Sequence, residues 1–80
     1  MLQQLTLDKS AIYQIRVKGY LGGRWSDYLG GLSISLSEDE EYTVTTLSGE
    51  VMDQAALIGI INSLYGMGFP LLSVEYQSLP

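Results

Sequence analysis

A single stretch of this 80-residue chain is patterned as an amphipathic helix, and this limits the fold to one helical layer. Asp53 suits the N-cap position, because its carboxylate can accept hydrogen bonds from the first free amides of a helix. Gly66 or Gly68 ends the pattern, and Pro70 prevents its continuation. Six apolar side chains between these limits fall on one side and are expected to face the core: Leu57, Ile58, Ile60, Ile61, Leu64 and Tyr65.

Alternation of apolar and polar residues predicts four strands around this helix. They cover residues 11–20, 32–37, 42–47 and about 71–77, which gives the element order βββαβ. The third strand has no clear apolar face, and we therefore expect it at the edge of the sheet. In the fourth strand, the inward side chains are expected to be Leu72, Val74 and Tyr76.

These elements predict a two-layer α+β fold, with a four-stranded mixed sheet and one helix on one face. A right-handed crossover through the helix would make the third and fourth strands run parallel, and a spatial order 3-2-1-4 gives consistent directions. The other sheet face is polar and is expected to stay open, because so short a chain supplies no second covering layer. We expect a single domain over residues 1–80, with frayed ends at 1–10 and 78–80.

The connection between the first two strands is rich in glycine. Residues 21–31 contain the pairs Gly22-Gly23 and Gly30-Gly31. Because glycine tolerates a positive φ, we expect positive φ angles to turn the chain at both pairs. We also expect Trp25 to fold back over one end of the core.

The composition removes most catalytic chemistry. The chain has no cysteine and no histidine, which excludes a thiol nucleophile, thiolate and imidazole metal ligands, and the commonest general base. The acidic run at 38–41 lacks the spacing of a calcium loop and is interpreted as a solvated turn. No spacing brings two of Asp27, Glu50 and Asp53 into one cleft. We therefore expect no enzymatic activity, no metal and no cofactor.

The distribution of charge limits the partners. The net charge is −5, but it divides into +3 over residues 1–24 and −8 over residues 25–80. Four basic residues are few for phosphate contacts, so we expect neither nucleic acid nor an acidic lipid surface as a partner. Residues 54–74 carry no charge, but polar residues, glycines and Pro70 interrupt them, which argues against a membrane span. The first residues lack the features of a secretory signal, and we expect a cytoplasmic location.

The side of the helix opposite the core stripe is unusual, because exposed helix faces normally carry Lys, Glu or Arg. Here the positions are small and uncharged: Ala55, Gly59, Asn62, Ser63 and Gly66. A glycine inside a helix costs about 1 kcal/mol relative to alanine, and a contact would offset this cost. We interpret this helix face, or the open sheet face, as the contact surface of a non-enzymatic protein–protein interaction module, which binds a protein partner or a second copy of the chain. A weakly polar surface without a function is the alternative interpretation.

A second hypothesis places a small-molecule sensing site between the helix and the 21–31 connection. The pocket would be lined by the aromatic residues Trp25, Tyr28, Tyr65 and Phe69. Aromatic clusters of this kind also occur as ordinary core packing.

Three sequence strings resemble a recurrent family of small bacterial proteins of unknown function. They are W-S-D-Y-L-G-G-L-S-I at 25–34, S-G-E-V-M-D-Q-A-A-L-I-G-I-I at 48–61 and F-P-L-L-S-V at 69–74. The family pattern usually has a second tryptophan where this chain has Tyr28, and a histidine where it has Ile58. The resemblance implies a compact bacterial domain and supplies no reaction, ligand or partner.

Overall fold

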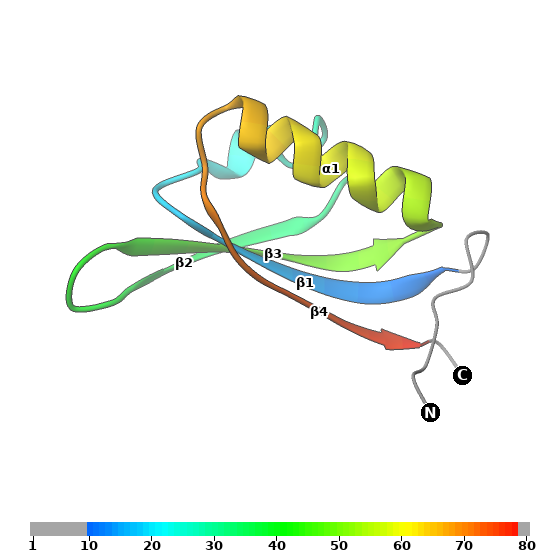
Figure 1. Cartoon of the computed structure of the whole chain (residues 1–80), viewed down its shortest axis with the longest axis horizontal. Coiled ribbons are helices and arrows are strands. Elements are labelled where there is room, and N and C mark those ends of the chain that lie inside the picture. The colour runs from blue at the N-terminus through cyan, green and yellow to red at the C-terminus, as the bar shows by residue number, and fades with distance from the viewer. Residues whose placement is uncertain (1–9, 79–80) are drawn as a thin grey trace.

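The computed structural model describes residues 10–78 (Figure 1). Its elements in chain order are β1 (Ala11–Lys18), a 3₁₀ turn η1 (Gly23–Trp25), β2 (Ser33–Glu38), β3 (Thr43–Val51), α1 (Gln54–Gly66) and β4 (Leu71–Ser78). The α+β class, the four strands, the single helix and the βββαβ order are confirmed. The predicted frayed ends lie outside the described residues except for Ser10 and for Ser78, the last residue of β4.

The sheet is antiparallel throughout rather than mixed. Its spatial order is β2-β3-β1-β4, which differs from the predicted order 3-2-1-4. β3 and β4 do run in the same direction, because both pair antiparallel with β1 between them. The difference arises because β1 and β2 are not neighbours. The 19–32 connection is long enough to pass β3, whereas the short acidic turn after β2 forms a hairpin with β3.

β3 is a central strand, in contrast to the edge position that its sequence indicates. Thr45 and Leu47 on its helix side are fully buried. The alternation of inward apolar side chains in β3 cannot be recognised in the sequence, because one inward position holds the polar Thr45 and another holds Gly49, which has no side chain. Inside the core the Thr45 hydroxyl donates to the carbonyl of Gly19 and accepts from the backbone N–H of Leu21. A hydrogen-bonded threonine can therefore occupy a core position.

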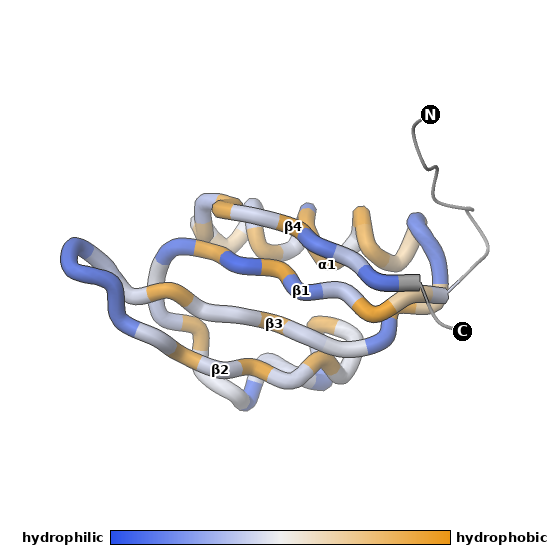
Figure 2. The backbone as a smooth tube through the Cα atoms, turned by 90° about the horizontal axis from the view of Figure 1, so that it is seen from below, coloured by the Kyte–Doolittle hydropathy of each residue, from blue (hydrophilic) through white to orange (hydrophobic). Residues whose placement is uncertain are grey.

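α1 and the 19–32 connection lie on the same side of the sheet and form the second layer (Figure 1). From the opposite side, no described element covers the strands, and α1 lies behind β1 and β4 (Figure 2). Asp53 caps α1 as predicted, with Oδ1 accepting from the Ala56 N–H at 2.8 Å. The buried core between the layers consists of Ala11, Tyr13, Ile15, Val17, Leu21, Leu29, Leu32, Leu47, Val51, Leu57, Ile60 and Leu64.

β4 contains an irregularity near its start that changes which side chains face inward. The pairs on either side of it are Val17 with Leu71 and Arg16 with Ser73. Leu72 between them has no opposite residue and lines a hollow with Arg16 on the open face of the sheet. Leu71 therefore takes the inward position that the sequence pattern assigns to Leu72.

Candidate functional site

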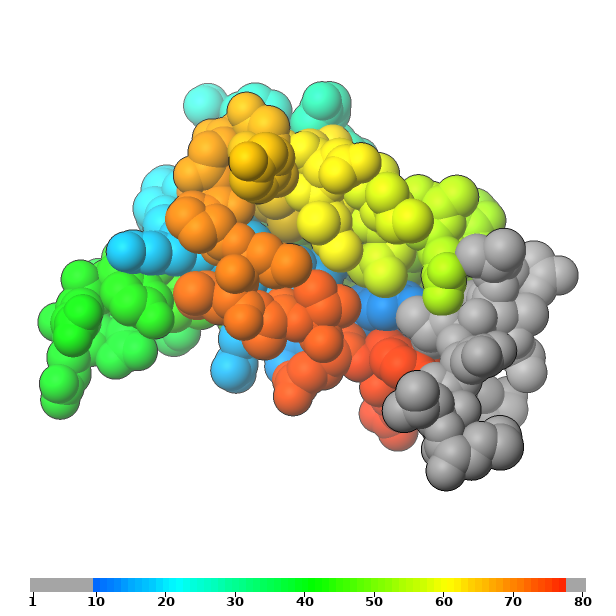
Figure 3. All heavy atoms as spheres, in the orientation of Figure 1, coloured from blue at the N-terminus to red at the C-terminus, as the bar shows by residue number. Residues whose placement is uncertain are grey.

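One side of the molecule combines a flank of α1 with the sheet edge formed by β4. α1 packs against β4, and Figure 3 shows them side by side, α1 in yellow above β4 in orange and red. Both elements contribute exposed apolar side chains on the helix side of the sheet: Ile58, Tyr65, Leu71, Val74 and Tyr76. We call these five residues the α1–β4 face.

Ile58 and Tyr65 lie on the flank of α1 that is turned toward β4. The opposite flank carries Ala56 and Ile60, which line a small hollow with Gly30 of the 19–32 connection. Because helical residues follow one another at about 100°, Ile58 and Tyr65 point within about 20° of each other and away from that connection. Ile58 is 54% exposed and Tyr65 is 80% exposed, so water surrounds most of both side chains.

β4 is an edge strand, paired with β1 on one side and with no described strand on the other. Such an edge presents unpaired backbone N–H and C=O groups, which can pair with another strand. Its residues Val74 and Tyr76 lie opposite the buried Ile15 and Tyr13, but they remain 37% exposed. The rings of Tyr76 and Tyr13 are in contact, with centroids 5.8 Å apart. Burial raises the pKa of the Tyr13 hydroxyl above its ordinary value, and the nearby Tyr76 adds to this shift.

The predicted contact residues of the helix lie mostly on its outer side. Four of them are exposed, namely Ala55, Gly59, Asn62 and Gly66, and Ser63 is half-buried. The prediction that Ile58 and Tyr65 belong to the core is wrong. The buried stripe of α1 contains only Leu57, Ile60 and Leu64. α1 is covered only by the sheet and by one connection, so the stripe that it buries is narrower than predicted. Ile58 and Tyr65, which flank this stripe, therefore remain in solvent.

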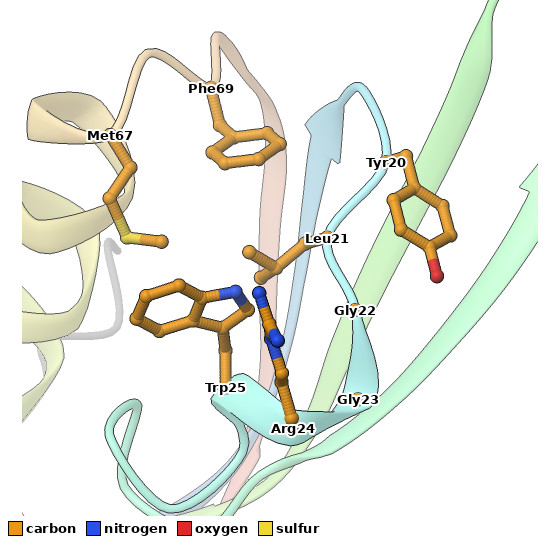
Figure 4. A pocket seen from close by; sticks show the side chains of 8 residues that line it. All are labelled: Tyr20, Leu21, Gly22, Gly23, Arg24, Trp25, Met67 and Phe69. Atoms are coloured by element: carbon orange, nitrogen blue, oxygen red, sulfur yellow. The ribbon is translucent and has the colours of Figure 1, made fainter.

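A second candidate is a hollow of about 810 Å³ between the C-terminal end of α1 and η1 (Figure 4). Met67 and Phe69 lie across it from Trp25 (Figure 4). The Arg24 guanidinium carbon lies 5.9 Å from the centroid of the Trp25 ring, within the range of a cation–π contact. The remaining lining residues are Tyr20, Leu21, Gly22 and Gly23. The hollow thus joins an apolar lining with one cationic group.

The structure brings together only two of the four aromatic residues predicted to line this pocket. Trp25 and Phe69 both line the hollow. Tyr28 packs edge-on against Trp25, with centroids 5.8 Å apart, but does not line the hollow. Tyr65 belongs to the α1–β4 face. Trp25 itself is 36% exposed, so it borders the hollow rather than closing the core.

The two glycine pairs of the connection differ in conformation. Gly30 and Gly31 have positive φ angles of 81° and 74°, as predicted. Gly22 precedes η1 with an extended φ of −70°, and neither Gly22 nor Gly23 has a positive φ. Positive φ therefore turns the chain only at the second pair.

The acidic residues hold local turns and caps. Asp39 in the turn after β2 accepts a hydrogen bond from the Glu40 N–H at 2.6 Å, and its own N–H donates to the carbonyl of Tyr42 at 2.8 Å. Among residues 10–78, no three acidic side chains are grouped so that they could hold a metal ion. None of the helices in this range is long and apolar enough to cross a membrane.

A family model described as "Domain of unknown function (DUF8691)" matches residues 12–75. The chain belongs to this family. The DUF8691 match runs from β1 into β4 and includes α1 and the hollow beside η1. It confirms that the chain is a member of an uncharacterised family, and the family description assigns no activity. No curated protein and no solved structure matches the chain.

Proposed function

We propose that this DUF8691 domain is a non-enzymatic interaction module that binds a protein through the α1–β4 face. The observation that carries the proposal is the exposure of Ile58 and Tyr65 next to the edge of β4 that pairs with no described strand. Contiguous exposed apolar side chains are characteristic of protein interaction sites. Residues 54–74 also carry no charged side chain that would have to be desolvated on contact.

Gly59, on the exposed side of α1, supports the same function. At Gly59, a Cβ would meet no atom within 4 Å beyond its chain neighbours and the adjacent backbone of the helix. Its absence of a side chain is therefore not required by packing within the chain. It leaves the backbone of α1 open to close approach by another molecule, at a cost in helix stability of about 1 kcal/mol. The bacterial origin that the motifs suggest stays a prediction.

Site-specific photo-crosslinking in cells that produce the protein tests this proposal. A photoreactive amino acid replaces Tyr65 on the face or, as a matched control, Tyr20, which is an equally large aromatic residue with 67% exposure away from the face. We expect discrete crosslinked species from position 65 and none of these species from position 20. Position 65 yielding no species, or both positions yielding the same ones, would contradict the proposal.

The hollow beside η1 supports a second candidate function, the binding of a small molecule. Its apolar lining together with Arg24 favours a ligand with an apolar body and a negatively charged group. The lone tryptophan of the chain lines the hollow, so its fluorescence should respond to such a ligand. In a screen of small carboxylates, a binder should raise the melting temperature of the wild type but not of Trp25→Ala. A screen in which no carboxylate changes the fluorescence or the melting temperature would reject this candidate.

A further inference from the structure

We infer that the occupant of the α1–β4 face is a second copy of this chain, joined to the first by antiparallel pairing of the two β4 strands. The inference rests on the proposed function and specifies its partner. The pairing would extend two four-stranded sheets into one eight-stranded sheet, with both helices on the same side.

The two edges of the sheet differ in how well they are protected against pairing. β2 is a six-residue strand that ends in Glu38 and leads directly into an acidic turn with Asp39, Glu40 and Glu41. Charges at an edge are a common means of preventing strand addition. β4 has eight residues, contains no lysine or proline, and carries Glu75 as its single charge. β4 is therefore the edge suited to pairing.

Antiparallel pairing of identical strands is self-complementary. The same surface is used on both subunits, so the contact closes as a two-fold dimer and leaves no further β4 edge free. A two-fold axis perpendicular to the sheet keeps the helix side of one subunit next to the helix side of the other. The exposed Ile58 and Tyr65 of each subunit would then approach the dimer axis beside β4.

Repulsion between like charges excludes one register of the pair, the register centred on Glu75. Centring on Val74, near the middle of β4, sets Val74 opposite Val74 of the partner subunit and Ser73 opposite Glu75 of the partner subunit. This avoids placing the two Glu75 carboxylates directly opposite each other, which would be destabilising. Within one subunit Arg16 lies opposite Ser73 on the open face. Because Ser73 is small, the Arg16 guanidinium can extend across it toward Glu75 of the partner subunit.

The area required for a stable dimer is available on this face. A standard interface buries about 800 Å² per partner, which is roughly one-seventh of the 5622 Å² accessible surface of the chain. Strand pairing alone covers less than this, so the exposed flank of α1 must take part. The two elements already form one continuous face (Figure 3).

Sedimentation equilibrium of the full chain tests the inference, with concentrations from about 5 µM to about 1 mM. We expect the mass to rise from the monomer value of 8.8 kDa toward twice that value. Val74→Lys should raise the dissociation constant at least about tenfold, because it places two lysines opposite each other at the dimer axis. Tyr20→Lys, an exposed substitution away from the face, should leave the dissociation constant unchanged.

A charge reversal tests the register without changing a packed residue. Arg16 and Glu75 are both exposed, so Arg16→Glu and Glu75→Arg should each fold normally and weaken the dimer about three- to tenfold. The double reversal should restore the wild-type dissociation constant to within about twofold. A double variant as weak as the single variants would overturn the proposed register.

The two proposals fail in distinguishable ways. A strict monomer at about 1 mM overturns the inference of self-association, since the contact would then be weaker than about 4 kcal/mol. If position 65 nevertheless crosslinks to a different protein in cells, the proposed interaction function stands. If position 65 gives no crosslink and the chain is monomeric, both proposals fail.

Discussion

The side chain of Thr45 on β3 holds the backbone of Leu21 in the connection that follows β1. Its hydroxyl oxygen accepts a hydrogen bond from the Leu21 N–H at 3.1 Å and donates one to the carbonyl of Gly19. Both Thr45 and Leu21 are buried. The 19–32 connection is thereby anchored to the central strand and can serve as part of the second layer.

Thr45→Val is expected to destabilise the domain although it keeps the shape of the side chain. The valine removes both hydrogen bonds and leaves the buried Leu21 N–H without this acceptor, at a cost of about 2 kcal/mol. Urea unfolding followed by circular dichroism measures the change. Thr46→Val on the open face is the control and should stay within about 0.5 kcal/mol of the wild type. Equal stability of the two variants would show that the hydrogen bonds of Thr45 contribute nothing net.

Two glycines of the helix region should respond to alanine in opposite directions. Gly59 lies inside α1 with open space around it, so Gly59→Ala should stabilise the domain by about 1 kcal/mol. Gly68 has a φ of +90° directly after the helix, where its N–H donates to the Tyr65 carbonyl and the Phe69 N–H donates to the Leu64 carbonyl. This arrangement requires a left-handed residue, so Gly68→Ala should cost about 1 kcal/mol. Urea midpoints of the two variants should therefore fall on either side of the wild-type value, and a shift in the same direction for both would contradict this account.

Local features of the fold could be predicted from the sequence because they depend on neighbouring residues. The helix start at Asp53, the alternation of β1 around Ile15, and the turn at 38–41 all follow from side-chain chemistry within a few positions. The exposure of Gly59 and Asn62 follows from the helical period in the same way. The pairing partner of a strand has no such local signal, which is why the predicted order 3-2-1-4 was wrong.

The parts of the candidate site that the sequence did not predict also depend on contacts between distant parts of the chain. Ile58 and Tyr65 are apolar, and the sequence does not state how wide a stripe the rest of the fold will cover. The displacement of Leu72 could not be predicted, because the irregularity in β4 is defined only by its pairing with β1.

Leu57 and Ile58 are neighbours in the chain but should respond very differently to truncation. Leu57 is 8% exposed and belongs to the core, so Leu57→Ala should cost about 2–5 kcal/mol. Ile58 lies largely in solvent, and alanine is the better helix former, so Ile58→Ala should stay within about 0.5 kcal/mol of the wild type. Thermal and urea unfolding of dilute samples measure both changes. A large loss of stability in Ile58→Ala would show that this residue belongs to the core and not to the α1–β4 face.

The stability of the domain should fall at high pH because of Tyr13. Burial holds the pKa of its hydroxyl above the ordinary value of 10.0 in the folded chain, whereas the unfolded chain has the ordinary value. Above about pH 10 the unfolded state therefore loses this proton first, and unfolding becomes more favourable as the pH rises toward the folded-state pKa. Below the unfolded-state pKa the group contributes no pH dependence. Melting temperatures measured between neutral pH and about pH 11 should decline less steeply for Tyr13→Phe than for the wild type. Tyr20→Phe, at an exposed tyrosine, is the control and should follow the wild-type curve, and parallel curves for all three proteins would exclude Tyr13 as the source of the alkaline loss.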